Sequence, residues 1–169
     1  MSEPDIGAII LTPIGTIRSP FKECFGIPRQ AGLAPAAAGV VELFPPFASA
    51  EAVRGLEGFS HIWVVSLLHQ RHASEWHPTV RPPRLGGNQR VGVFASRSPY
   101  RPNPLGLSVV SLDRIEIEGS GVHLHVAGLD LLDGTPVLDI KPYIPYADAL
   151  ADAHGGFAAT RLQPLLDVE

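Results

Sequence analysis

Residues 97–108 concentrate side chains suited to binding an anion or a polar ligand. Their sequence is Arg-Ser-Pro-Tyr-Arg-Pro-Asn-Pro-Leu-Gly-Leu-Ser. The three prolines fix φ and remove backbone donors, so we expect a stiff, extended loop that loses little entropy on binding a ligand. A rigid connection between strands would explain the prolines, but not the group formed by Arg97, Arg101 and Asn103. The composition therefore favours a binding site.

A second group of polar residues lies in the segment 129–145. Asp133 begins the sequence Asp-Gly-Thr-Pro, which is typical of a turn. A turn does not explain Asp130, Asp139 and Lys141, which fall within the same twelve positions. Acidic side chains among apolar residues must be paired or functional. We therefore favour a functional role for this segment.

Several familiar kinds of site are absent from the sequence. It has no P-loop, no nucleophile elbow, no Gly-rich dinucleotide fingerprint and no pair of cysteines for zinc. His69, His72 and His77 raise a metal site as an alternative, but their spacing is loose and only Glu75 lies near them, so no metal is predicted. The single cysteine indicates a reducing compartment, and no apolar run is long enough to span a membrane.

Charge is unevenly distributed along the chain. The net charge is -4, yet residues 69–112 hold six arginines and a single acidic residue. Arginine suits phosphates and stacked bases, so a polyanionic partner is one interpretation. A solvated surface without a partner is the other.

Gly and Pro number 17 each, which favours many short elements over long helices. A short helix is expected at 49–54, where Ser49 could cap it. The segment 71–90 is expected to be irregular. The pattern of apolar residues predicts seven strands, giving a mainly antiparallel barrel or sandwich. These strands are expected at 9–17, 39–44, 61–68, 91–96, 107–118, 122–129 and 136–140.

The clearest prediction is a hairpin that turns at Gly119-Ser120. A two-residue turn there places Ile117 opposite Val122 and Ile115 opposite Leu124. The same register places Glu116 opposite His123 and Arg114 opposite His125. Apolar residues thus face apolar residues, and polar residues face polar ones.

Several unusual segments follow one another in order over about residues 9–157. They include Ile14-Gly-Thr-Ile-Arg-Ser-Pro20, Pro28-Arg-Gln30, Phe59-Ser-His-Ile-Trp63, Arg81-Pro-Pro-Arg-Leu-Gly-Gly-Asn88, Val91-Gly-Val-Phe-Ala-Ser-Arg97, Arg101-Pro-Asn-Pro104 and Asp139-Ile-Lys-Pro-Tyr143. Through them the chain resembles the TrmO-type (TsaA-like) tRNA methyltransferases.

The resemblance implies an antiparallel β-barrel with one or two short helices, which uses S-adenosylmethionine without a Rossmann fold. The implied substrate is tRNA that carries N6-threonylcarbamoyladenosine next to the anticodon, methylated at N6 in the cytoplasm by a homodimer with the cofactor near the subunit interface. Residues 1–147 would form the barrel domain. Residues 148–169 would be a tail, or the start of a linker to the further domain that many members have.

The resemblance also assigns site residues by position. The implied cofactor contacts are Gln30, Ala31, Gly32, His69, Gln70, Arg97, Leu107, Asp130, Leu131, Asp133, Gly134 and Thr135. The substrate contacts that we expect are Arg29, Arg84, Arg101, Asn103 and Tyr143. The candidate catalytic residues are His69, Asp133, Asp139 and Lys141. Among them, an acidic residue of the 130–139 segment or His69 would accept the proton from N6, and an arginine or Lys141 would bind the threonyl carboxylate.

Two other functions remain open. A non-catalytic RNA-binding barrel would use the arginine-rich segment, with Trp76, Phe94 and Tyr100 for stacking. A methyltransferase acting on another acceptor would keep the cofactor site and change the substrate.

Overall fold

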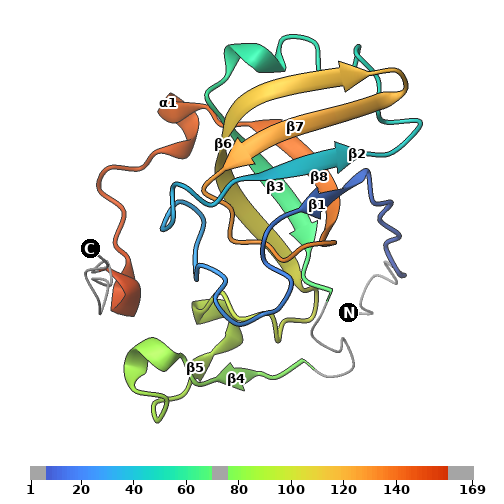
Figure 1. Cartoon of the computed structure of the whole chain (residues 1–169). Coiled ribbons are helices and arrows are strands. Elements are labelled where there is room, and N and C mark those ends of the chain that lie inside the picture. Colours follow the sequence, from blue (N-terminus) through green and yellow to red (C-terminus); the bar gives the residue numbers. More distant parts are fainter. Residues whose placement is uncertain (1–6, 70–75, 160–169) are drawn as a thin grey trace. The chain divides into compact units, whose positions relative to one another are not determined.

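The computed structural model describes residues 7–69 and 76–159 (Figure 1). Within these residues the chain forms two compact units. The barrel unit comprises residues 7–69 and 104–143, and the second unit comprises residues 76–103 and 144–159. The predicted boundary at residue 147 stays a prediction.

Six antiparallel strands close the barrel unit into a barrel, in the order β1-β2-β7-β6-β3-β8. The strands are β1 (Gly15–Arg18), β2 (Gly39–Leu43), β3 (His61–Leu67), β6 (Leu105–Glu118), β7 (Gly121–Ala127) and β8 (Pro136–Pro142). The predicted antiparallel β-barrel is therefore confirmed.

Alternating side chains fill the interior of the barrel. In β7 the buried residues are Val122, Leu124 and Val126, while His123 and His125 between them face outward. The alternation has the two-residue period of a strand with one face in a core. His125 Nε2 lies 2.6 Å from the carboxylate of Glu116 across the hairpin, which lowers the pKa of Glu116.

The predicted hairpin register is confirmed at all four pairs. Ile117 lies opposite Val122, Ile115 opposite Leu124, Glu116 opposite His123 and Arg114 opposite His125. Gly119 has a φ of +58°, which a two-residue hairpin turn requires and which glycine adopts without strain.

Different segments cover the two ends of the barrel. Residues 129–135 cover the end at which β7 finishes and β8 begins, and they bury Leu129 and Leu131 in the core. The segment 44–59, which includes the 3-10 turn η1 (Leu56–Gly58), covers the opposite end and contributes Val53 to the same core.

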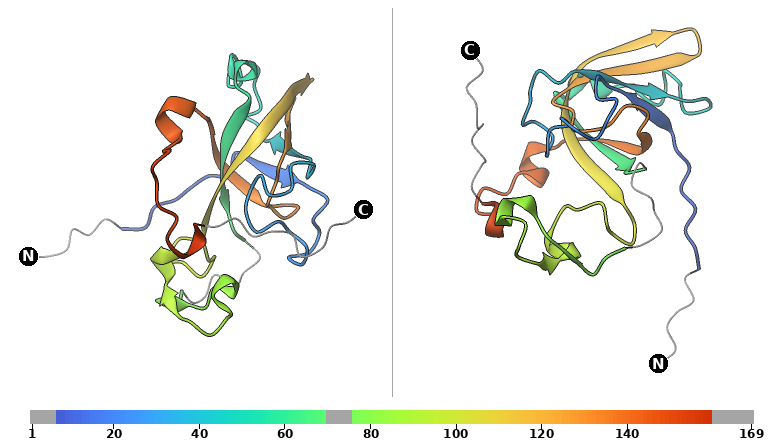
Figure 2. Two further views of the ribbon diagram at one scale, coloured as in Figure 1. Left: turned by 90° about the vertical axis from the view of Figure 1, so that its left-hand side faces the viewer. Right: turned by 60° about the horizontal axis from the view of Figure 1, so that its bottom comes forward.

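The second unit is built from short elements. Strands β4 (Thr79–Val80) and β5 (Val91–Gly92) pair with each other, as the turned views in Figure 2 show in green. The unit also contains η2 (Pro83–Leu85), η3 (Val93–Ala95), α1 (Pro145–Asp148) and η4 (Gly156–Ala158). The strand predicted at 91–96 is wrong after Gly92, because residues 93–95 turn into η3.

The helix predicted at 49–54 is also wrong. Ser49 does accept a hydrogen bond from the backbone of Ala52, at 3.2 Å, but residues 50–55 form successive turns. The one α-helical segment of the described chain is the four-residue α1. In the parts of the chain that the structure describes, no helix has the length and apolar character that crossing a bilayer requires.

Candidate functional site

Residues 129–135, here called the aspartate turn, are bonded to the strand β1. The backbone N–H of Gly134 donates to the carbonyl of Ile17 at 2.8 Å, and the N–H of Ile17 donates to the carbonyl of Thr135 at 2.9 Å. Gly134 has a φ of +76°, in the left-handed region that favours glycine. The turn is therefore an extension of the barrel wall with a fixed backbone.

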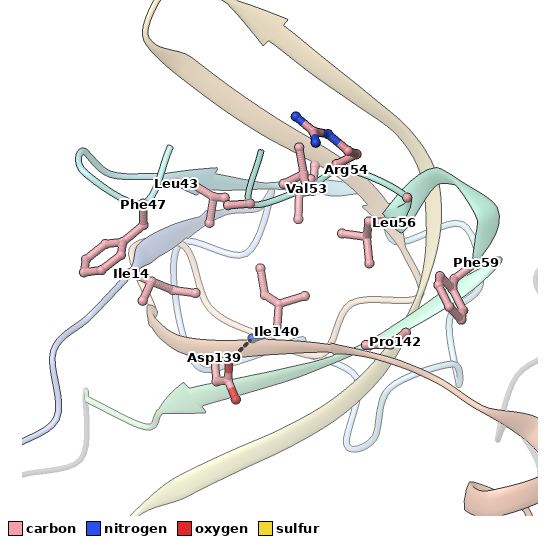
Figure 3. A pocket seen from close by; sticks show the side chains of 13 residues that line it. Ile14, Leu43, Phe47, Val53, Arg54, Leu56, Phe59, Asp139, Ile140 and Pro142 are labelled. Carbon is pink, nitrogen blue, oxygen red and sulfur yellow. Dashed lines mark hydrogen bonds between the residues drawn. The ribbon is translucent and has the colours of Figure 1, made fainter. Parts of the chain in front are cut away.

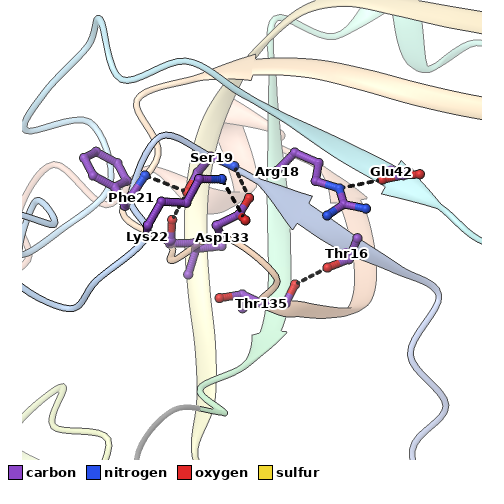
Figure 4. A network of polar contacts seen from close by, with 9 residues as sticks. Thr16, Arg18, Ser19, Phe21, Lys22, Glu42, Asp133 and Thr135 are labelled. Carbon is purple, nitrogen blue, oxygen red and sulfur yellow. Dashed lines mark hydrogen bonds and ion pairs between the residues drawn. The ribbon is translucent and has the colours of Figure 1, made fainter.

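Both carboxylate oxygens of Asp133 are engaged (Figure 4). Oδ1 accepts a hydrogen bond from the backbone N–H of Ser19 at 3.0 Å, and Oδ2 lies 2.8 Å from Nζ of Lys22. The hydrogen bond with Lys22 is the largest cause that lowers the pKa of Asp133, and the hydrogen bond with the backbone of Ser19 is the second. Asp133 is therefore ionised at neutral pH and holds the aspartate turn against residues 19–22.

Asp130 is bonded to the barrel interior. Ser108, whose side chain is almost fully buried in β6, donates a hydrogen bond to Oδ1 of Asp130 at 2.6 Å. Nearby, the N–H of Gly32 donates to the carbonyl of Gly128 at 2.9 Å. This bond places the loop containing Gln30, Ala31 and Gly32 beside the start of the aspartate turn. Two predicted cofactor-binding segments, about 100 residues apart in sequence, thus meet at one end of the barrel.

Other predicted residues lie on the outer wall of the barrel. Leu107 lies opposite Val65, and Val65 lies opposite Asp139, so the three form a row across β6, β3 and β8. Leu107 is 60% exposed, and Oδ2 of Asp139 lies 3.2 Å from Nζ of Lys141. The three predicted acidic residues therefore lie in two places. Asp139 is on the outer wall of the barrel, whereas Asp130 and Asp133 are at its end.

Tyr143 follows β8 on the same wall. Its ring packs against the ring of Trp63, with centroids 6.0 Å apart. Its N–H donates to the carbonyl of His61 at 3.0 Å. Tyr143 and Lys141 therefore lie on the face that carries Asp139.

The barrel unit also contains an apolar pocket of about 570 Å³ at the end opposite the aspartate turn (Figure 3). Leu43, Val53 and Leu56 line it together with Phe47 and Phe59. Asp139 also belongs to the lining of this pocket, and its Oδ1 accepts a hydrogen bond from the N–H of Ile140 at 2.9 Å. The pocket is therefore separate from the predicted cofactor segments.

The second unit contains Arg84, Arg97, Arg101 and Asn103. Arg101 is half-buried, and its Nη1 donates to the carbonyls of Val93, Ser96 and Ser98 at 3.3, 2.7 and 3.4 Å. Arg101 therefore braces its own loop. Because the loop 97–103 and the aspartate turn belong to different units, their predicted convergence on one pocket stays a prediction.

Two predicted residues lie in loops of the barrel unit, and a third falls outside the described part of the chain. His69 follows β3 and is exposed, Arg29 is exposed in the loop after β1, and Gln70 lies outside the described residues. His72, which was named with His69 and His77 as an alternative metal site, also lies outside the described residues. Among residues 7–69 and 76–159, no group of three or more histidine, cysteine or acidic side chains could hold a metal ion.

Comparison with known protein families gives a match over most of the chain. The tRNA-methyltransferase O N-terminal domain matches residues 16–149. The chain belongs to the TrmO family. The fold agrees, because a TrmO crystal structure from Pseudomonas aeruginosa superposes with a TM-score of 0.78 and 48% identity, over 94% of this chain and 66% of that one.

Several curated TrmO-family relatives are similar in sequence. A tRNA (adenine(37)-N6)-methyltransferase of Escherichia coli is 54% identical over 86% of this chain and 62% of its own length. A putative S-adenosylmethionine-dependent methyltransferase of P. aeruginosa is 57% identical over 88% of this chain and 60% of its own length. A probable S-adenosyl-L-methionine-binding protein of Pyrococcus abyssi is 40% identical over 93% of this chain and 80% of its own length. The chain thus spans about 60% of the first two relatives.

Two residues of this TrmO-family barrel were not predicted from the sequence. They are Lys22, which pairs with Asp133, and Ser108, which donates to Asp130. One signal was available, because a partly buried carboxylate requires a donor or a cation. The sequence does not say which residue supplies it, since Lys22 is 111 positions before Asp133 and Ser108 is 22 before Asp130.

Proposed function

We propose that this chain catalyses S-adenosylmethionine-dependent methylation of N6 in tRNA that carries N6-threonylcarbamoyladenosine next to the anticodon. The names of its TrmO-family relatives support methyl transfer to a tRNA adenine. The structural observation that carries the proposal is the meeting of the loop 30–32 with the aspartate turn. The reaction would take place in the cytoplasm.

The barrel end has features that suit the cofactor. A Cβ built on Gly32 or on Gly134 would meet no described atom within 4 Å, so a ligand can approach the backbone at both positions. Asp130, held by Ser108, offers a carboxylate acceptor for hydroxyl or amino groups. Gln30 to Gly32 and Asp130 to Thr135 would hold the cofactor, which supplies a methyl group bonded to a positively charged sulfur.

The acceptor nitrogen, N6 of the modified adenosine, must be activated by the protein. Its lone pair is delocalised into the purine ring and the carbamoyl carbonyl, so it is a poor nucleophile. A base must take the N6 proton as the new nitrogen–carbon bond forms. Asp133 is poorly suited to this task, because its pKa is lowered and Lys22 and Ser19 engage both of its oxygens. Both oxygens of Asp139 are also engaged, by the N–H of Ile140 and by Nζ of Lys141, so His69 is the better candidate.

The threonyl carboxylate of the substrate requires a cation, for which arginine is apt. Arg29, Arg84 and Arg101 stay candidates, with Asn103 and Tyr143 as further substrate contacts. Replacing Arg29 by alanine should lower kcat/KM on threonylcarbamoylated tRNA at least tenfold, at unchanged cofactor affinity. Equal kcat/KM for this variant and the wild type would contradict a role for Arg29.

We also propose a homodimer. Leu107, an expected cofactor contact, faces outward from the barrel, whereas Asp130 is bonded to the inward-facing Ser108. A second copy that covers the wall around Leu107 would let one protomer complete the site of the other. Replacing Leu107 by glutamate should convert a dimer into a monomer in light scattering and lower cofactor affinity. A glutamate at exposed Ile117 is the control, and it should leave the mass unchanged.

The direct test measures methyl transfer from labelled S-adenosylmethionine to two tRNAs, one with and one without the threonylcarbamoyl group. We expect transfer to the modified tRNA and little to the other. Equal transfer to both would favour another acceptor. A protein that binds RNA but shows no thermal shift with the cofactor would be a non-catalytic RNA-binding barrel instead.

A further inference from the structure

The residues 76–103 of the second unit carry a concentrated positive charge. They contain five arginines and no acidic residue or lysine, in a chain whose net charge is -4. Arg81, Arg90 and Arg97 are exposed, while Arg84 and Arg101 are half-buried. Such a surface suits the phosphate groups of a nucleic acid.

Within this segment, residues 93–98 form a turn whose backbone is fixed from several sides. Nη1 of Arg101 donates to three of its carbonyls, as described above. The hydroxyl of Ser96 also donates to the carbonyl of Val93 at 2.8 Å and accepts from the N–H of Ser98 at 3.3 Å. We call residues 93–98 the braced turn.

The braced turn exposes an aromatic ring. Val93 is 1% exposed, but the next residue, Phe94, is 75% exposed. The guanidinium carbon of Arg101 lies 5.9 Å from the centroid of the Phe94 ring. A cation at this distance interacts favourably with the ring and restricts its position. Phe94 is thus a large apolar side chain held in solvent by a rigid support, which the fold of the second unit does not require.

We infer that the braced turn, with Phe94 at its centre, binds the single-stranded anticodon loop of tRNA by stacking a base on the Phe94 ring. Arg90 lies on the same chain segment and binds a phosphate of the loop. An aromatic ring can stack only on a base that is not already stacked inside a duplex, so a loop fits this surface better than a stem. The inference rests on the proposed function for the identity of the RNA.

Three variants at one position test the stacking. Phe94→Ala removes the ring, Phe94→Leu keeps apolar volume without a flat face, and Phe94→Trp keeps the face. The probe is a synthetic anticodon stem-loop, and its dissociation constant is measured by fluorescence anisotropy at fixed salt. We expect about tenfold or greater weakening for the alanine and leucine variants and near wild-type affinity for tryptophan. Because Phe94 is exposed, melting temperatures should be unchanged.

Two arginine variants test the phosphate contacts. Arg90→Gln should reduce the slope of log affinity against log salt by about 0.7, the value for one phosphate contact on a single strand. Arg54→Gln, at an exposed arginine of the barrel unit, is the matched control and should leave the slope unchanged.

The inference is overturned if Phe94→Leu binds the stem-loop as tightly as the wild type does. It is also overturned if the wild type binds the isolated stem as tightly as the stem-loop, or binds neither. A wild type that binds the stem-loop through Phe94 but transfers no methyl group contradicts the proposed function alone. A wild type that methylates tRNA while Phe94→Ala binds normally contradicts this inference alone.

Discussion

Replacing Gly39 with alanine is expected to lower the free energy of unfolding by about 3 kcal/mol. A Cβ at this position would lie 2.6 Å from the carbonyl oxygen of Arg18 and would also overlap a methyl group of Leu129. The backbone of β1 and the core side chain of Leu129 would both have to move. Urea unfolding followed by circular dichroism measures the change.

Gly58 provides the matched control for this substitution. A Cβ on Gly58 would meet no described atom within 4 Å, and its backbone is not in the left-handed region. Gly58→Ala should therefore change stability by less than about 0.5 kcal/mol. Because Leu129 begins the aspartate turn, Gly39→Ala should also weaken cofactor binding, whereas Gly58→Ala should not. Equal unfolding curves for the two variants would show that the β1–β2 contact tolerates a methyl group.

Removing the Asp133 side chain is expected to cost about 2 kcal/mol of stability at pH 7. Asp133→Ala leaves the N–H of Ser19 and the ammonium group of Lys22 without their shared acceptor. It also loosens the aspartate turn, which would stay bonded to residues 19–22 through the hydrogen bonds from Ser19 Oγ to the carbonyl of Leu131 and from the N–H of Asp133 to the carbonyl of Phe21, so the affinity for S-adenosylmethionine should fall as well. Chemical unfolding and calorimetric titration with the cofactor measure the two effects separately.

The contribution of the Asp133 charge should depend on pH. The folded protein lowers the pKa of Asp133, so the ionised carboxylate stabilises the fold above the ordinary aspartate pKa of about 3.9. This contribution is lost as the pH falls through the lower, folded-state pKa. The stability gap between the wild type and Asp133→Asn should therefore be full at pH 7 and close below about pH 4. The same comparison is then made in proteins that carry Lys22→Met. If the stability gap at pH 7 disappears there, the ion pair with Lys22 is its source. If the gap persists, the ion pair is not its source.

The sequence predicted those parts of the fold that local patterns determine. The register of the β6–β7 hairpin followed from the alternation of residues around Gly119-Ser120, because a two-residue turn leaves one pairing with all apolar side chains on the same face. The strand predicted at 91–96 failed because its end depends on Arg101, whose guanidinium binds the carbonyls of the turn. Such a contact carries no periodic signal.

The candidate site illustrates the same division. The Asp-Gly-Thr-Pro turn and the need to pair its acidic neighbours could be predicted from propensity and electrostatics. The partners could not, since Lys22 and Ser108 become neighbours of the aspartate turn only when the barrel closes. The separation of Asp130 and Asp133 from Asp139 could not be predicted either. It depends on an irregularity in the β3–β8 register, which places Asp139 on the outer wall.

The pairing of β3 with β6 has a consequence for how this family can diversify. These strands pair as far as Leu67 and Leu105, so the chain leaves the barrel for residues 76–103 and returns to it at directly adjacent positions. An insertion whose ends are tied together in this way can change length and sequence without altering a single hydrogen bond of the barrel. Under the proposed function, changes in this segment would alter the RNA contacts of the braced turn while leaving the aspartate turn unchanged.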